Sequence, residues 1–272
     1  MREFKFNKKS LPLGERAYIM GILNVTPDSF SDGGRYNSLK TALLHTEEML
    51  GQGADIIDVG AVSTRPFSEK VSEEEEWERL KEILPAIRRE FPDAVISVDT
   101  VSPLIAEKSI NAGADIINDV SGVFLSDMAE IIKKYGCGWV VMHGGICVRK
   151  TEDITVFPEG IASDVNAFFG EMVKNAEAYG ISRSALCLDP GLGFSKTNAQ
   201  NRELLEGFGG LDNYGCALMC ALSRKRFIRE GTDGSEGDII RATVRADSFA
   251  IENGADIIRV HDVREHREGR FQ

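Results

Sequence analysis

GADIIDV at residues 53–59 recurs as GADIIND at 113–119 and as GADIIRV at 254–260. Each copy follows an amphipathic stretch of the kind that forms a surface helix. Within each copy we expect the glycine to end the helix, Ala and Asp to turn the chain, and the β-branched residues to enter a strand. The repeat therefore predicts a helix followed by a short strand at three places in the chain.

Other apolar runs are expected to supply the remaining strands, at 17–23, 94–98, 139–142, 185–188 and 216–222. These runs are apolar throughout rather than alternating, which is typical of a parallel sheet covered on both faces. Helical patterns separate them, at 39–51, 103–112, 126–135, 162–179 and 236–253. One more helix is expected to begin at a capping box formed by Ser72 and Glu75 and to continue to residue 91.

Eight strands separated by helices in 272 residues match a closed (β/α)₈ barrel. An open, doubly wound sheet is the alternative, but that fold does not require the tripled element. Because no linker or shift in composition marks a boundary, residues 1–272 are expected to form a single domain. Only residues 261–272 follow the eighth strand, so the final helix is expected to be short.

The composition narrows the classes of function. The chain has 32 Lys and Arg against 43 Asp and Glu, a formal net charge of −11, and no basic stripe, so nucleic-acid binding is not expected. No apolar run approaches the roughly 20 residues of a membrane helix, and the charged start lacks a signal-type segment. The five cysteines form no CxxC pair and are expected to be reduced thiols. We therefore expect a cytoplasmic protein that does not contact membranes.

A polar residue ends every apolar run. All strands of a barrel run in the same direction, so these residues are expected to gather at the C-terminal rim, where barrel enzymes build their active sites. They are Asn24, Asp58, Asp99, Asn118 with Asp119, His143, Asp189, residues 223–225, and Arg259 with His261. The mixture of acids, amides and bases favours a ligand with a flat, donor-rich part and a separate anionic part.

The donor-rich part suits a 2-aminopyrimidinone ring. A buried carboxylate such as Asp99 or Asp189 can accept two parallel hydrogen bonds from its amidine-like edge. Asn118 can donate and accept at once, and Lys225 can donate to a carbonyl oxygen or a ring nitrogen.

The anionic part suits a phosphate group. Arg65, Arg259 and His261 are expected to bind phosphate oxygens, because guanidinium groups match them bidentately. The amide oxygen of Asn24 is a suitable ligand for Mg²⁺, which commonly binds through substrate phosphates and few protein ligands. The loops at 24–38 and 63–70 are expected to act as lids.

At these residues the chain resembles the dihydropteroate synthases of folate biosynthesis. The resemblance begins with MGILNVTPDSFSDGGRY at 20–36 and continues through IIDVGAVSTRP (56–66), ISVDT (96–100), GADIIND (113–119), VVMH (140–143), LDPGLGF (188–194), SRK (223–225) and IIRVHDV (257–263). It implies a barrel enzyme, usually dimeric, that condenses 6-hydroxymethyl-7,8-dihydropterin diphosphate with 4-aminobenzoate. The products would be 7,8-dihydropteroate and diphosphate, and Mg²⁺ would be the cofactor.

The resemblance also implies roles for individual residues. The residues expected to bind the pterin are Asp99, Asn118, Asp189 and Lys225. Those expected to handle diphosphate and Mg²⁺ are Asn24, Arg65, Arg259 and His261. Those expected to form the 4-aminobenzoate site are Thr64, Pro66, Phe194 and Ser223, and Met142 is a further substrate-binding candidate. Asp58 is expected near the reacting carbon, and the catalytic candidates are Asp58, Arg65, Lys225 and Arg259.

The chain departs from the family pattern at several positions. It reads AVSTRPF at 61–67 where the family commonly has Gly-Glu-Ser-Thr-Arg-Pro-Gly, and Gly144 follows His143 in place of the more usual Met. Arg226 stands where a serine usually contacts the 4-aminobenzoate carboxylate. The short final helix would also reduce the family's dimer contact. These departures leave open a non-catalytic pterin-binding paralogue.

A pterin-binding methyltransferase domain that serves a corrinoid partner is the other alternative. Such a domain needs no diphosphate site, so Arg65 together with RVH at 259–261 disfavours it.

Overall fold

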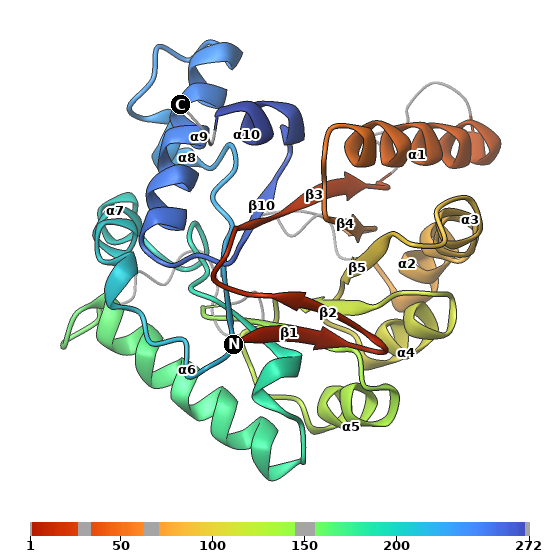
Figure 1. The fold of residues 1–272 in the computed structure, drawn as a ribbon, viewed down its shortest axis with the longest axis horizontal. Coiled ribbons are helices and arrows are strands. Elements are labelled where there is room, and N and C mark those ends of the chain that lie inside the picture. Colours follow the sequence, from red (N-terminus) through yellow and green to blue (C-terminus); the bar gives the residue numbers. More distant parts are fainter. Residues whose placement is uncertain (1, 27–33, 63–70, 145–155, 270–272) are drawn as a thin grey trace.

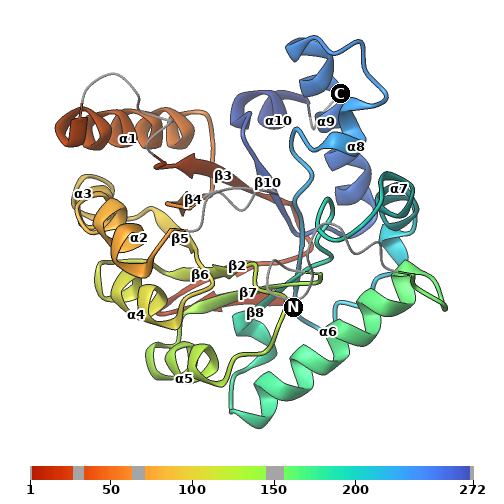
Figure 2. The same ribbon diagram turned by 180° about the vertical axis from the view of Figure 1, so that it is seen from behind.

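Eight parallel strands close into a barrel in the order β10-β3-β4-β5-β6-β7-β8-β9 (Figures 1 and 2). The computed structural model describes residues 2–26, 34–62, 71–144 and 156–269. The barrel strands are β3 (Tyr18–Asn24), β4 (Ile56–Gly60), β5 (Val95–Asp99), β6 (Ile116–Asp119), β7 (Gly138–Met142), β8 (Leu186–Asp189), β9 (Ala217–Cys220) and β10 (Ile257–Val260). Because β10 pairs with both β3 and β9, the sheet has no open edge, and the predicted (β/α)₈ barrel is confirmed over the open-sheet alternative.

Helices surround the strands in both ribbon views. They are α1 (Gly34–Gly51), α2 (Glu73–Leu80), α3 (Ile83–Glu90), α4 (Pro103–Asn111), α5 (Ser126–Tyr135), α6 (Ile161–Ala178), α7 (Asn198–Glu206), α8 (Arg226–Arg229), α9 (Glu236–Glu252) and α10 (Val263–Gly269). Sequence patterns did not predict α7 or α8. The helix expected from residue 39 begins at Gly34, so the loop after β3 is shorter than expected. Within the described ranges, none of these helices is long and apolar enough to span a bilayer.

The single helix expected between Ser72 and residue 91 is divided into α2 and α3. The capping box is present, since Ser72 Oγ accepts from Glu75 N at 3.2 Å and Glu75 Oε2 accepts from Ser72 N at 3.1 Å. Pro85 lies in the first turn of α3, where a missing N–H removes no helical hydrogen bond. A continuous helix would place its ring against the carbonyl of residue 81, which is why the helix breaks there.

An N-terminal hairpin closes one end of the barrel. β1 (Glu3–Phe6) and β2 (Lys9–Pro12) pair antiparallel, and Figure 1 shows them across the middle of the ring of helices. Phe4 and Phe6 are fully buried, together with interior barrel residues such as Met20. Gly138 leaves room for this packing, because a Cβ there would lie 2.8 Å from Phe4 Cζ. Sequence patterns did not predict the hairpin.

The three repeated elements share one structural role. Each glycine has a positive φ, and each aspartate accepts a hydrogen bond from the backbone N–H of a residue in a neighbouring strand. The pairs are Asp55 with Ile19 at 2.9 Å, Asp115 with Ile96 at 3.1 Å, and Asp256 with Leu218 at 3.0 Å. These aspartates precede their strands and so lie at the N-terminal end of the barrel, opposite the predicted rim.

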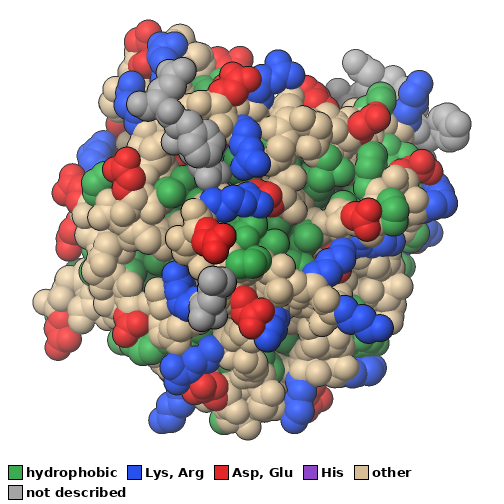
Figure 3. Space-filling view, in the orientation of Figure 1, with side chains coloured by type: hydrophobic (Ala, Val, Ile, Leu, Met, Phe, Trp, Pro, Cys, Tyr) green, Lys and Arg blue, Asp and Glu red, His purple; other side chains and the backbone are tan. Residues whose placement is uncertain are grey.

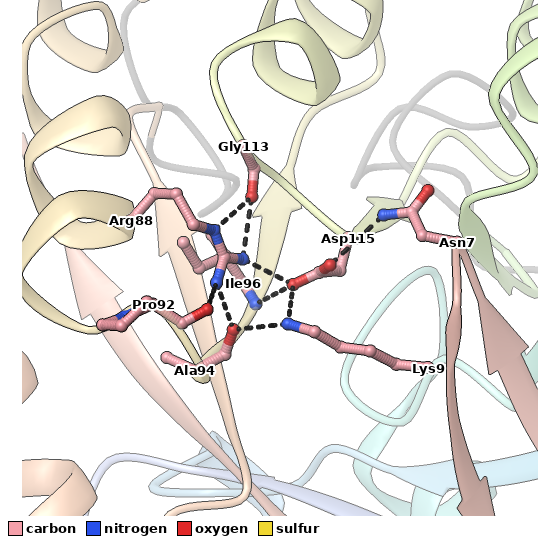
Figure 4. Close-up of polar contacts among 8 residues, drawn as sticks. All are labelled: Asn7, Lys9, Arg88, Pro92, Ala94, Ile96, Gly113 and Asp115. Atoms are coloured by element: carbon pink, nitrogen blue, oxygen red, sulfur yellow. Dashed lines mark hydrogen bonds and ion pairs between the residues drawn. The ribbon is translucent and has the colours of Figure 1, made fainter.

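Asp115 also ties the hairpin to the barrel (Figure 4). Its carboxylate accepts from Arg88 Nη2 at 2.7 Å, Lys9 Nζ at 3.3 Å and Asn7 Nδ2 at 3.2 Å.

Basic and acidic side chains are interspersed on the face drawn in Figure 3, which has the orientation of Figure 1. That face therefore carries no field of a single sign.

The cysteines that the structure describes are buried and unpaired, as expected for reduced thiols. They are Cys137, Cys187, Cys216 and Cys220. Cys147 lies outside the described residues.

Candidate active site

Strand register brings polar residues from distant parts of the sequence side by side. Asn24 of β3 is level with Gly60 of β4, Gly60 with Asp99 of β5, and Asp99 with Asn118 of β6. All of these residues lie at the carboxyl ends of their strands. The predicted convergence therefore follows from the way the barrel is paired.

Arg259 joins two of the carboxylates at the centre of this rim. Its Nε donates to Asp58 Oδ2 at 2.7 Å, and its Nη2 donates to Asp99 Oδ2 at 3.0 Å. Asn118 Nδ2 donates to the same Asp58 oxygen at 3.1 Å. Asp58 is completely buried, whereas the side chain of Arg259 is 20% exposed. Arg259 is thus more exposed than the two carboxylates that it binds.

Burial controls the charge of this cluster. It raises the pKa of Asp99 to about 7; the charge of Arg259 opposes the shift and that of Asp58 adds to it. Burial also disfavours the charged form of Arg259, but Asp58 and Asp99 hold its pKa above the ordinary value. Two carboxylates therefore compete for one guanidinium, and a ligand that donates hydrogen bonds would relieve the excess of acceptors.

Three buried polar atoms at this end of the barrel have no hydrogen-bond partner among the described residues. They are Asp58 Oδ1, Asn118 Oδ1 and Ser97 Oγ. Buried polar groups are rarely left unpaired in proteins. The cluster therefore has unused acceptors that suit a polar ligand.

Ser97 was not among the sequence candidates. It precedes Asp99 by two residues on β5, so both side chains are on the same face of the strand. A hydroxyl in an otherwise apolar run, two residues before a strand-end carboxylate, is the sequence signal that would have identified it.

Asp189 and Lys225 form a second buried group. Burial raises the pKa of Asp189, which accepts from Gly191 N at 2.7 Å. Burial lowers the pKa of Lys225 to about 8, against the opposing charge of Asp189. Lys225 Nζ donates to the carbonyl oxygen of Leu192 and lies 4.6 Å from the centre of the Phe194 ring. A cation and an aromatic ring are thus held together beside a buried carboxylate.

Other candidates border this second group. Met142 of β7 is buried and level with Asp189 of β8. Gly193 has φ +83°, and a Cβ there would lie 2.6 Å from Lys225 Cδ. A side chain at this position would displace the lysine.

The loops that follow β9 and β10 are bonded to each other. Ser223 Oγ lies 3.0 Å from His261 Nδ1 and accepts from His261 N at 3.2 Å. Arg224 binds the carboxylate of Asp262 through two nitrogens, with Nε 2.9 Å from Oδ2. Ser223 and His261 are therefore neighbours on the rim.

Asn24 lies at the edge of the central cluster. Asn24 is exposed. A Cβ on Gly60 would lie 3.6 Å from Asn24 Oδ1 and 3.7 Å from Asp99 Cβ, so Gly60 separates the two side chains. The described residues contain no group of three or more His, Cys, Asp or Glu that could hold a metal ion by itself. A single exposed amide oxygen fits Mg²⁺ only where phosphate oxygens supply most of the ligands.

Asp119 and His143 were expected to join the rim cluster, but their side chains bind other groups. Asp119 and Asn118 point to opposite faces of β6, and the carboxylate of Asp119 accepts from Ser121 N at 2.9 Å and Trp139 Nε1 at 3.3 Å. His143 Nε2 lies 2.8 Å from Asp164 Oδ2 of α6. Both side chains support the surrounding loops and helices. Thr64, Arg65 and Pro66 lie outside the described residues.

A closed (β/α)₈ barrel with buried carboxylates, an arginine and a lysine at the carboxyl ends of its strands is the arrangement of a barrel enzyme. Comparison with known proteins defines the family. The family described as "Pterin binding enzyme" matches residues 20–261. The dihydropteroate synthase of Clostridium beijerinckii is 40% identical over 264 residues, which cover 96% of this chain and 95% of that protein.

Solved structures agree with this match. A dihydropteroate synthase from Clostridium difficile, crystallised in the presence of pteroic acid, has a TM-score of 0.88 and 37% identity, covering 95% of both chains. A dihydropteroate synthase from Xanthomonas albilineans with 4-aminobenzoic acid has a TM-score of 0.89 and 32% identity, covering 98% of this chain and 95% of that one. The chain belongs to the pterin-binding enzyme family, and within it to the dihydropteroate synthases.

Proposed function

We propose that this protein condenses 6-hydroxymethyl-7,8-dihydropterin diphosphate with 4-aminobenzoate to give 7,8-dihydropteroate and diphosphate. The observation that carries the proposal is the cluster in which Arg259 bridges Asp58 and Asp99 while Asp58 Oδ1 and Asn118 Oδ1 remain unpaired. A pterin ring offers the N–H donors that such acceptors need. The relatives named above support the same reaction.

The pterin would lie between the two buried groups. Asp99 and Asp189 would accept hydrogen bonds from the aminopyrimidinone edge and the ring nitrogens, and Asn118 would both donate and accept. Lys225 would donate to a carbonyl oxygen or a ring nitrogen. Met142 would pack against the ring.

Breaking the bond between the pterin methylene carbon and the diphosphate oxygen leaves a positive charge that the electron-rich ring shares. Asp58 would stabilise that charge, and Arg259 and His261 would stabilise the negative charge on the departing oxygen. Arg65 would assist from the loop after β4. Asn24 would hold Mg²⁺, which supplies further neutralisation of the diphosphate charge.

The amine of 4-aminobenzoate would then form the new C–N bond and lose one proton, which the released diphosphate or water would accept. A neutral aryl amine is already nucleophilic, so no strong base is required. Ser223, Phe194, Thr64 and Pro66 would form its site. Arg226 is exposed and begins α8 directly after Lys225, where it would pair with the carboxylate of this substrate.

The proposal also covers the domain organisation, the cellular location and the assembly of the protein. We infer that the chain forms one domain, acts in the cytoplasm and assembles as a homodimer. Sedimentation of the purified protein would test the assembly, and a monomer at micromolar concentration would contradict it.

The reaction is tested by mixing the protein with pterin diphosphate, Mg²⁺ and 4-aminobenzoate and measuring diphosphate release. Release that depends on 4-aminobenzoate is the expected result. Tight pterin binding without any release would instead support a non-catalytic pterin-binding protein, the alternative suggested by Arg226. In the Lys225→Ala control, binding of pterin diphosphate should weaken, because one partner of the ring is removed.

A further inference from the structure

A buried ionic pair joins α9 to α10 next to the loop that carries His261. Asp247 of α9 and His266 of α10 each have 1% of their side chain exposed, and His266 Nε2 lies 3.0 Å from Asp247 Oδ2. The proposed chemistry uses neither residue. A pair of ionisable groups sealed from water is costly to maintain unless its interactions are well satisfied.

Both ring nitrogens of His266 have hydrogen-bond partners. Its Nδ1 lies 2.6 Å from the carbonyl oxygen of Asp262, and its Nε2 faces the carboxylate of Asp247. A carbonyl oxygen only accepts, so Nδ1 carries a proton, and when Asp247 is ionised Nε2 donates as well and the ring is an imidazolium. Burial raises the pKa of Asp247, and the hydrogen bond and charge of His266 oppose that shift. Burial opposes this charge, but the hydrogen bond to Asp247 and the charge of Asp247 raise the pKa of His266 above its ordinary value.

A chain of contacts leads from His266 to the substrate residues. The carbonyl that His266 holds belongs to Asp262, which is adjacent to His261. The carboxylate of Asp262 binds Arg224, which is adjacent to Lys225. Arg224 has φ +58°, a left-handed conformation that an arginine adopts only when its surroundings hold it there.

We propose that His266, charged and paired with Asp247, is a positioning residue that holds the loop after β10 against the loop after β9. Its role is to keep His261 and Lys225 at the spacing that pterin diphosphate requires, so this inference rests on the proposed function. His266 is a separate anchor from the Ser223–His261 contact, because it binds the backbone carbonyl of Asp262 and the carboxylate of Asp247. Losing it would leave the Asp262 carbonyl with only the 3.3 Å bond from the backbone N–H of residue 266, and Asp247 without its cationic partner.

Two variants test the role. His266→Phe removes both donors, whereas Asp247→Asn keeps the shape and an acceptor oxygen but removes the charge, so it should fold even if the first variant does not. Thr243→Val is the matched control: Thr243 is a buried α9 residue whose hydroxyl donates to Ile239 O within its own helix. Circular dichroism and the melting temperature would establish that each variant is folded.

The readouts are the calorimetric Kd of pterin diphosphate and the Michaelis constant for each substrate. We expect His266→Phe and Asp247→Asn to weaken pterin diphosphate binding by about tenfold or more, which is the effect on affinity of losing one hydrogen bond from a charged group such as Lys225. For the aminobenzoate substrate, the Michaelis constant at saturating pterin diphosphate should change by less than about twofold. Thr243→Val should bind both substrates as the unmodified protein does.

Folded variants with unchanged affinity for pterin diphosphate would overturn the positioning role. Equal weakening by Thr243→Val would also overturn it, because the effect would then be a general loss of α9 packing. An unmodified protein that binds no pterin diphosphate would contradict the proposed function itself, and the positioning role with it. Unmodified binding together with unchanged variants contradicts the positioning role alone.

Discussion

Arg259 Nε and Asp58 Oδ2 are 2.7 Å apart although 201 positions separate the two residues in the sequence. The contact exists because β10 is bonded to β3, and β3 to β4, so the last strand of the barrel lies two strands from β4. Barrel closure thus builds the proposed site. An open sheet would have left Arg259 at one edge.

Arg259→Lys tests whether the bridge between Asp58 and Asp99 matters beyond its charge. A lysine keeps the positive charge but lacks the planar fork that reaches both carboxylates. We expect turnover to fall by about 100-fold, the usual scale for loss of one preorganised charge-stabilising donor. Steady-state kinetics would measure it, and a rate within about threefold of the unmodified enzyme would contradict the role of Arg259 in stabilising the leaving group.

The raised pKa of Asp99 predicts a pH-dependent stability. The folded protein holds a proton on Asp99 up to about pH 7, whereas the ordinary value is 3.8, so the folded state binds more protons between these values. The contribution of this group to stability is therefore present at low pH and is lost as the pH rises towards 7.

Asp99→Asn removes this titration. Urea unfolding between pH 4 and 7 should show a flatter pH dependence than in the unmodified protein, by at most about 1.4 kcal/mol per pH unit for one proton. Asp93→Asn, a variant of an exposed carboxylate, is the control. Parallel curves for the unmodified protein and Asp99→Asn would show that Asp99 is ionised throughout this range.

Ser97→Ala separates ligand binding from stability. The hydroxyl of Ser97 is buried and unpaired, so its removal should leave the free energy of unfolding unchanged or slightly higher. If the hydroxyl contacts the ligand, pterin affinity should fall by about three- to tenfold, which is the value of one hydrogen bond. Calorimetry and urea unfolding of one sample would measure both, and unchanged affinity would place Ser97 outside the pterin site.

The barrel could be predicted from the sequence because each of its strands is a short run of apolar residues, a pattern that fits a buried parallel strand and few other elements. The same runs located the rim, since parallel strands end on one side. Side-chain direction was the harder property: Asn118 and Asp119 are neighbours in the sequence, yet period-two alternation turns only the first toward Asp58. His143 likewise ends a strand but contacts α6.

Features that depend on three-dimensional packing were missed. The hairpin of β1 and β2 has strands of only four residues. Its local sequence signal is Asn7 at the turn, a residue type that tolerates the φ of 52° found there. The pairing of Asp247 with His266 joins two helices through the space between them, and no spacing in the sequence indicates it. Proline chemistry at Pro85, by contrast, could have predicted the break between α2 and α3.

Gly138→Ala tests whether the hairpin contributes to stability independently of the proposed site. A Cβ at residue 138 would lie 2.8 Å from Phe4 Cζ and 3.1 Å from Ile116 Cγ1, so the Phe4 ring must shift. Overpacking of this kind costs about 1–3 kcal/mol, and urea unfolding should show a loss in that range. Pterin affinity should be unchanged, because Gly138 begins β7 at the opposite end of the barrel from Met142.

Gly136→Ala is the control for packing. Its added Cβ would meet no atom within 4 Å, although the φ of +64° at this residue adds backbone strain of its own. Weakened pterin binding at full stability would mean that the two ends of the barrel are coupled.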